Sequence, residues 1–295
     1  MASLREIKDR IGSVRSTLKI TSAMKLVASA KLRKAQRAIE ALRPYERTLA
    51  EILSAVGPVR SDVPASTAPT AIVAIASNSS LCGGFNANVI RKALETIRGC
   101  EGPVEVYPLG RKMAEGLRRA GYTADQDYND LVGHPAYDKS AALARRLAER
   151  FERGELSRVV LVYTSFVSAS RQEPVAETFL PFTEIPDQVG DDEKSSFAGP
   201  SSSFAGLTGE SPATDYILEP DAAALAAQLL PQVMLLKFHA AILDSAAAEQ
   251  AARTLAMQTA TDNAEELLGE LTLEYNKGRQ QKITAEILDL LGGAQ

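Results

Sequence analysis

The sequence contains no tryptophan and only two cysteines and two histidines among its 295 residues. Aromatic residues make up 5%, so its apolar content is mainly alanine, leucine, valine and isoleucine, which favours helix packing over an aromatic-lined pocket. Cys82 and Cys100 form no C-x-x-C motif, and His134 and His239 are far apart. We therefore expect a reducing compartment, no zinc site and no Cys–His catalytic pair.

Segments that would direct the chain into a membrane are also missing. The N-terminus lacks the apolar core of a secretory signal, and no apolar run approaches the roughly 20 residues that cross a bilayer. We therefore expect any membrane association to be mediated by a partner. The net charge is only -4, but residues 1–50 carry twelve basic and four acidic residues, whereas residues 244–295 carry four basic and nine acidic ones.

The N-terminal segment has the clearest periodicity in the chain. Ser3 and Glu6 have the spacing of a capping box, which begins a helix. Seam residues then recur every three or four positions over more than three heptads, which is typical of a coiled-coil strand. They are Leu4, Ile7, Ile11, Val14, Leu18, Thr21, Lys25, Ala28, Leu32, Ala35, Ile39 and Leu42. The helix is expected to bend at Pro44 and to end at Gly57 and Pro58.

Two of these seam positions are polar. Thr21 and Lys25 stand where a simple zipper would have leucine or isoleucine. They either leave this stretch open to contact by another surface or form a polar layer that fixes the register of two helices. The sequence does not distinguish these interpretations.

A matching helix is predicted from Asp221 to the C-terminus. Residues 231–291 alone would measure roughly 90 Å at about 1.5 Å per residue, which exceeds the width of a compact domain of this size, so part of the helix must project. Its many alanines would make a slim rod, although alanine is also simply the best helix former. The expected seam is Leu225, Leu229, Val233, Leu236, Ala240, Leu243, Ala247, Ala251, Leu255, Ala260, Ala264, Leu267, Leu271, Tyr275, Ile283, Ile287 and Leu290.

Between these helices, short apolar runs alternate with amphipathic helical segments. Residues 70–76, 104–107 and 159–163 are predicted strands, with 175–180 and 215–218 as candidate edge strands. This alternation predicts a mainly parallel sheet covered by helices on both faces, a Rossmann-like α/β layer domain. The predicted α/β fold thus has three parts: a coiled-coil helix at 1–57, the α/β domain at 70–219 with a flexible loop at 186–212, and a second coiled-coil helix at 220–295, antiparallel to the first.

The loop after the first predicted strand holds Cys82, Gly83 and Gly84, at the place where α/β folds bind ligands. It contains neither G-x-G-x-x-G nor G-x-x-x-x-G-K-[ST], so it lacks the glycine spacing and the lysine of a phosphate-binding loop. The paired glycines are explained by a tight turn. We therefore expect no cofactor, metal or catalytic residue in this chain.

Four segments resemble the gamma subunits of F-type, proton-translocating ATP synthases. Residues 20–35, with the sequence ITSAMKLVASAKLRKA, resemble that family's N-terminal helix, and residues 251–264 and 271–287 resemble its C-terminal signature. LCGGFN at 81–86 is similar to the family's loop after the first strand. Asn78, Ser79 and Ser80 depart from the acidic-basic-Gly run usual before it.

The resemblance implies a non-catalytic rotor. The antiparallel helix pair would stand inside the hexamer of alpha and beta subunits, and the head would bind an epsilon subunit and the ring of membrane c subunits, at the cytoplasmic face of the bacterial inner membrane. Rotation would couple proton flow to ATP synthesis on the beta subunits, or ATP hydrolysis to proton pumping. Lys25, Lys31, Arg33 and Lys34 would face acidic beta segments, Arg279 and Gln280 a beta-subunit loop, and Ile283 and Ile287 an apolar bearing.

One other class of function fits the residues. An α/β enzyme or a nucleic-acid-binding protein with a coiled-coil arm would also combine a basic helix with a layered head. Nucleotide or nucleic-acid binding by the isolated chain would favour that class, whereas co-purification with a nucleotide-bearing hexamer would favour the rotor, which itself is expected to bind no nucleic acid.

Overall fold

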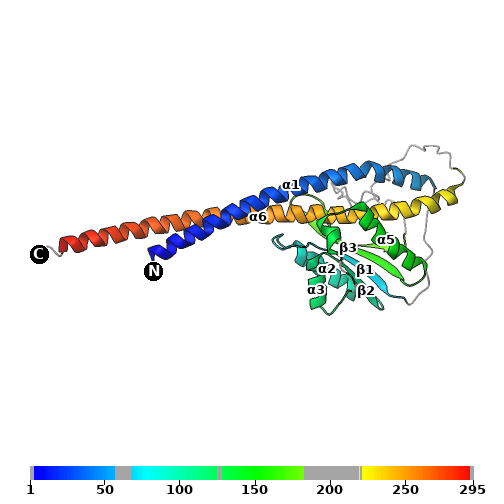
Figure 1. Ribbon diagram of the computed structural model, residues 1–295, viewed down its shortest axis with the longest axis horizontal. Coiled ribbons are helices and arrows are strands. Elements are labelled where there is room, and N and C mark those ends of the chain that lie inside the picture. Colours follow the sequence, from blue (N-terminus) through cyan, green and yellow to red (C-terminus); the bar gives the residue numbers. More distant parts are fainter. Residues whose placement is uncertain are drawn as a thin grey trace, which may run out of the picture.

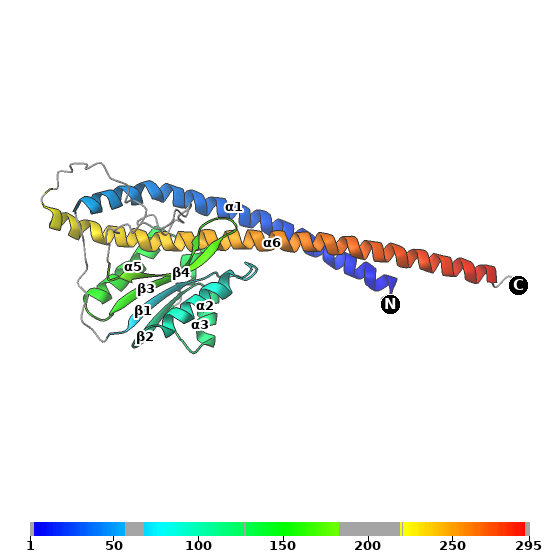
Figure 2. The same ribbon diagram turned by 180° about the vertical axis from the view of Figure 1, so that it is seen from behind.

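Two long helices lie side by side, and an α/β head is attached to one side of the pair (Figure 1). The computed structural model describes residues 3–56, 68–124, 126, 128–182, 219 and 221–292. Helix α1 (Leu4–Val56) and helix α6 (Ala222–Gly292) contain 53 and 71 residues. They run antiparallel, so the N-terminus of α1 and the C-terminus of α6 lie at the same end, away from the head (Figure 2). The predicted antiparallel pair is confirmed.

Helix α1 begins with the predicted capping box. The Ser3 backbone N–H donates to Glu6 Oε2 at 2.9 Å, and the Glu6 N–H donates to Ser3 Oγ at 3.3 Å. Two backbone donors at the helix start are thereby satisfied. The helix continues through Pro44 to Val56, and the predicted end at Gly57 and Pro58 and the predicted loop at 186–212 lie outside the described residues.

The predicted seam of α1 faces α6. All twelve of its residues are buried or half-buried, whereas most of the positions between them are exposed. Two contacts set the register: Thr21 Oγ1 lies 2.9 Å from Thr261 Oγ1, and a Cβ atom at Gly278 would lie 3.0 Å from Leu4 Cδ2. The spacing from 4 to 21 equals that from 261 to 278, so the helices pair without a gap. Leu4 is thus level with Gly278, and α6 extends beyond it.

The predicted seam of α6 is correct over the head and partly wrong beyond it. Leu255 and Leu267 are 49% and 44% exposed, and the buried positions are Met257, Thr261, Ala264 and Leu271. The predicted series stepped five residues between 255 and 260, which moves off the contact face of a helix with 3.6 residues per turn. At 267 and 268, two adjacent leucines fit the pattern equally, and apolarity alone could not choose between them.

The head contains a four-stranded sheet in the order β2-β1-β3-β4. The strands are β1 (Thr70–Ile75), β2 (Val104–Leu109), β3 (Arg158–Phe166) and β4 (Gln172–Leu180). Strand β1 pairs in parallel with β2 and β3, and β4 pairs antiparallel with β3. The predicted mainly parallel sheet is confirmed, and the candidate strand at 215–218 lies outside the described residues.

Helices cover both faces of this sheet. Alternate β1 residues, Ile72 and Ala74, pack toward α2 (Phe85–Arg98) and α3 (Arg111–Arg119). Their neighbours Ala71 and Val73 pack toward α4 (Asn129–Gly133), α5 (Tyr137–Glu152) and α6. This alternation follows from the two-residue period of a strand. The second core includes residues 233–242 of α6, so the shaft helix is also a layer of the head.

The prediction that no segment is apolar enough to cross a bilayer is wrong. Helix α6 contains an 18-residue window, within Ala224–Leu288, with a mean hydropathy of 1.3 and at most two charged residues, which is long and apolar enough to cross a bilayer. Alanine contributes much of this hydropathy, and polar residues interrupt the window, so it contains no long unbroken apolar run. The most apolar part of α6 packs against the sheet, where Val233, Leu236 and Ile242 are at most 2% exposed. A core helix accounts for this composition.

Candidate functional site on the helical shaft

The shaft projects well beyond the head. The loop after β1 reaches α6 at Arg253, whose Nη2 donates to Ser79 Oγ at 2.8 Å, and at Ala256, whose Cβ would lie 3.7 Å from a Cβ atom at Gly83. From residue 257 to 292, α6 continues for 36 residues, or about 54 Å at about 1.5 Å per residue. Figure 1 shows this stretch paired only with α1 and then alone. The candidate site is therefore the outer surface of a slender rod.

The four predicted basic contact residues do not form one cluster. Lys31, Arg33 and Lys34 are exposed, and Lys25 is half-buried on the seam, level with Met257. At about 100° per residue, the three exposed side chains point in different directions around the solvent side of α1. Within the described residues, none of the four forms an ion pair. They give the shaft a basic surface without a fixed internal partner.

An exposed apolar stripe on α1 was missed by the sequence reasoning. Ile20, Met24 and Val27 are 59%, 36% and 57% exposed, and their spacing of four and three residues continues to Lys31 and Lys34. We call these five residues the α1 stripe. The sequence carries the signal, since 20, 24, 27, 31 and 34 form a second helical series, each one residue before a seam position and therefore about 100° around the helix from it. The seam was interpreted as the whole apolar pattern of this segment, so the α1 stripe was not recognised.

The distal contact residues all lie on the unpaired end of α6. Arg279 and Gln280 are exposed, and Ile283 and Ile287 are 47% and 51% exposed. Because α1 begins level with Gly278, no α1 residue lies opposite them. Position 279 is 22 residues beyond Met257, which is level with Lys25, so about 33 Å of helix separates the distal residues from the basic ones. The structure thus divides the predicted contact residues between two levels of the shaft.

The loop after β1 is built as a turn clamped to the shaft. Arg253 also pairs with Glu249 at 2.6 Å, and the Ser77 N–H donates to Asn86 Oδ1 at 3.1 Å. Gly83 has a φ of +57°, a conformation that favours glycine, which confirms the predicted tight turn. Burial raises the pKa of Cys82, so its thiol is a poor nucleophile. Within the described residues, no three His, Cys, Asp or Glu side chains are placed to hold a metal.

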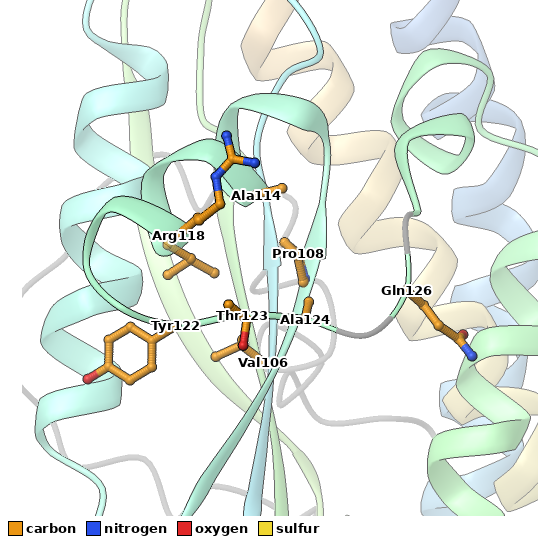
Figure 3. A pocket seen from close by; sticks show the side chains of 9 residues that line it. Val106, Pro108, Ala114, Arg118, Tyr122, Thr123, Ala124 and Gln126 are labelled. Atoms are coloured by element: carbon orange, nitrogen blue, oxygen red, sulfur yellow. The ribbon is translucent and has the colours of Figure 1, made fainter.

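A pocket of about 310 Å³ lies at the outer edge of the sheet, beside β2 and α3 (Figure 3). Val106, Pro108 and Leu117 supply apolar surface, and Arg118 is the only charged residue in its lining. A single exposed arginine supplies neither an acid–base pair nor a set of metal ligands. The pocket therefore carries no chemistry that competes with the shaft as the candidate site.

Two carboxylates, the buried Asp244 and the half-buried Glu177, lie where the head meets the shaft. Asp244 on α6 accepts a hydrogen bond from the Phe166 N–H at 3.2 Å, and burial raises its pKa to about 6. Burial also raises the pKa of Glu177 on β4, while Lys237 opposes that shift. These groups belong to the joint between head and shaft and were not singled out from the sequence.

Comparison with known proteins places this architecture in a family. The model of a family described as ATP synthase matches residues 3–295. The ATP synthase gamma chain of Bacteroides fragilis is 47% identical over 304 residues, which cover 100% of this chain and 99% of that protein. The gamma chain of Heliobacterium modesticaldum is 38% identical over 300 residues, with the same coverage.

Solved structures share the fold. A chain of the Euglena gracilis mitochondrial ATP synthase assembly of OSCP, F1 and c-ring matches 99% of this chain and 93% of its own length, with a TM-score of 0.66 and 18% identity. A chain of the Tetrahymena thermophila central stalk and c-ring matches 82% of this chain and 99% of its own length, with a TM-score of 0.54 and 22% identity. From its full-length relatives and the family match, the chain belongs to the ATP synthase gamma chain family.

Proposed function

We propose that this chain is the central rotor stalk of an ATP synthase, which couples rotation driven by protons to ATP synthesis and, in reverse, ATP hydrolysis to proton pumping. The observation that carries this proposal is the projecting rod: about 54 Å of α6 beyond Ala256, where the loop after β1 meets it, paired with α1 and then alone. Family membership assigns such a rod to a non-catalytic gamma subunit.

In this proposal, the rod stands inside the hexamer of alpha and beta subunits. The rod has different surfaces on different sides: the α1 stripe lies on one helix, and the distal end consists of α6 alone. A lopsided rod contacts each of three beta subunits differently and so stabilises a different conformation in each. Turning the rod exchanges these conformations. The beta subunits hold the catalytic sites, and this chain supplies only differential contact energy.

The chemistry of the surface suits sliding contact. Lys31, Arg33 and Lys34 are exposed, and exposed ion pairs contribute only about 0–1 kcal/mol each. Acidic segments of the beta subunits would therefore attract them without locking the rotor. Ile20, Met24 and Val27 would add apolar contacts, which require no fixed orientation between the two surfaces. Ile283 and Ile287 would turn in an apolar bearing at the top of the hexamer.

The head would bind the epsilon subunit and the c-ring and would thus connect the rod to the membrane sector. We place the complex at the cytoplasmic face of the bacterial inner membrane, with this chain peripheral and held there by its partners. The relatives are bacterial gamma chains, which supports a membrane-associated ATP synthase.

Co-purification tests this function most directly. A tagged copy of the chain, expressed in its native cell, should recover a nucleotide-bearing hexamer that hydrolyses ATP. A tagged head domain of an unrelated α/β protein is the control. Recovery of the chain alone, together with binding of nucleic acid, would instead support the alternative class of function.

A second experiment tests the distal contact residues. We expect Arg279→Ala/Gln280→Ala to lower ATP synthesis in energised membrane vesicles by removing a polar contact with a beta-subunit loop. Lys282→Ala/Glu286→Ala is a matched control, because it removes an exposed ion pair from the same unpaired segment, where the two side chains are 66% and 63% exposed. Equal synthesis rates in the two double variants would remove the assignment of Arg279 and Gln280.

A further inference from the structure

A buried polar layer crosses the seam of the projecting shaft. Thr21 on α1 and Thr261 on α6 are each 8% exposed, and their hydroxyl oxygens lie 2.9 Å apart. The adjoining seam residues on α6, Met257 and Ala264, are apolar and buried. Of the two interpretations that the sequence allowed for Thr21, the structure selects the polar layer between two helices.

Every acceptor and donor in this layer can be satisfied. Thr21 Oγ1 lies 3.1 Å from the Leu18 carbonyl, and Thr261 Oγ1 lies 2.8 Å from the Met257 carbonyl. Each hydroxyl has one proton, so one threonine donates to its own helix and accepts from the other, which donates across the seam. The bridge therefore forms with either threonine as its donor, and neither hydroxyl is left unpaired.

Small side chains recur in the seam on both sides of this layer. In the ungapped pairing, Leu18 is level with Ala264, and Ala35 is level with Ala247. Small side chains give shallow knobs and holes, which constrain axial sliding less than large interlocking residues do. If α1 moved one heptad toward the free end of α6, Thr21 would become level with Leu268, and the bridge would break.

We propose that Thr21 and Thr261 are positioning residues that hold the two shaft helices in register. A slip of one heptad would move the α1 stripe by about 10 Å along the axis relative to Arg279 and Gln280. The two contact levels of the shaft could then no longer engage one hexamer together. This inference rests on the proposed function, because the spacing of these levels matters only if the shaft contacts a surrounding ring.

The test replaces the polar layer by an apolar one of the same shape. In the assembled complex, Thr21→Val/Thr261→Val is compared with the wild type and with Thr21→Ser/Thr261→Ser, which keeps both hydroxyls. Register is measured by disulfide formation: Val14→Cys with Leu268→Cys reports the native level, and Val14→Cys with Tyr275→Cys reports a slip of one heptad. Single-cysteine variants show the contribution of Cys82 and Cys100.

We expect only the native disulfide in the wild type and in the serine variant. In the valine variant, the slipped disulfide should increase at least tenfold, and proton pumping per ATP hydrolysed should fall at least twofold. Its melting temperature should stay equal or rise, because removing both partners of a buried hydrogen bond together leaves no unpaired group. A polar layer that specifies register lowers stability relative to an apolar one.

Three results would overturn the proposal. The first is a valine variant that forms only the native disulfide at wild-type coupling. The second is a lower melting temperature with the native register kept, which would make the layer merely stabilising. The third is a slipped register with unchanged coupling.

If the complex with Thr21→Val/Thr261→Val does not assemble, Thr21→Val alone serves as the test. This variant breaks the bridge while Thr261 still donates to the Met257 carbonyl, and it should give the same slipped disulfide. A wild-type complex with native register but no coupling would contradict the proposed function instead.

Discussion

The joint between head and shaft contains an aromatic contact that can be tested. Phe238 on α6 and Phe179 on β4 are each 1% exposed, and their ring centroids lie 5.5 Å apart at an angle of 60°. Truncating a buried phenylalanine to alanine typically costs about 3–5 kcal/mol. Because Phe238 is fully buried and also loses an edge-to-face partner, we expect Phe238→Ala to lower the free energy of unfolding by about 4 kcal/mol.

Urea denaturation of the full chain, followed by circular dichroism at 222 nm, measures this loss. With an m value of about 1–3 kcal/mol per M, a loss of about 4 kcal/mol shifts the midpoint of the head's transition by more than about 1 M. Leu255→Ala is the control on the same helix. Its side chain is 49% exposed, so we expect a change within about 0.5 kcal/mol. Equal midpoints for the two variants would refute the conclusion that α6 is a core layer of the head.

Three further predictions follow from other contacts in the head. Gly110→Ala would place a Cβ atom 2.1 Å from the Ala76 carbonyl oxygen at a φ of +98°, so we expect a loss of about 3 kcal/mol or more, measured by urea denaturation. Burial raises the pKa of Asp244 from 3.8 to about 6, so the folded state binds more protons than the unfolded state in that window. Stability should therefore fall by up to about 3 kcal/mol as the pH rises from about 4 to 6, and in Asp244→Asn this contribution should vanish from the pH profile of unfolding. Hydrogen bonds from Arg150 lower the pKa of Glu105, so its contribution is present at neutral pH and is lost as the pH falls below about 4.5; because Glu105 is partly exposed, Glu105→Gln should cost at most about 1 kcal/mol in thermal unfolding at pH 7.

The sequence was sufficient for elements that repeat one rule over many residues. The seam from Leu4 to Leu42 repeats steps of three and four, and the capping box at Ser3 follows from spacing alone, so both were predicted correctly. The strands of the head were found because β-branched runs buried on both sides have no polar alternation. In each case, the local pattern determines the result without knowledge of the partner element.

Other features depend on which residue lies across the interface, and these could not be predicted. Thr21 was ambiguous until Thr261 was placed 2.9 Å from it, 240 positions away in the sequence. Leu255 and Leu267 were assigned to the seam because they are apolar, although apolarity does not determine which face of a helix is covered. The raised pKa of Asp244 could not be predicted either, because it results from burial that only the packed joint between head and shaft provides.

The double role of α6 explains why the shaft and the head can turn as one body. One continuous helix contributes Val233, Leu236 and Ile242 to the core of the head and then pairs with α1 beyond it, with no break between residues 222 and 292. A twisting force on the distal rod is therefore carried through backbone hydrogen bonds into side chains that are at most 2% exposed. A flexible linker between head and rod would absorb that force by rotating about its backbone dihedrals. A continuous helix packed against the sheet cannot rotate in this way.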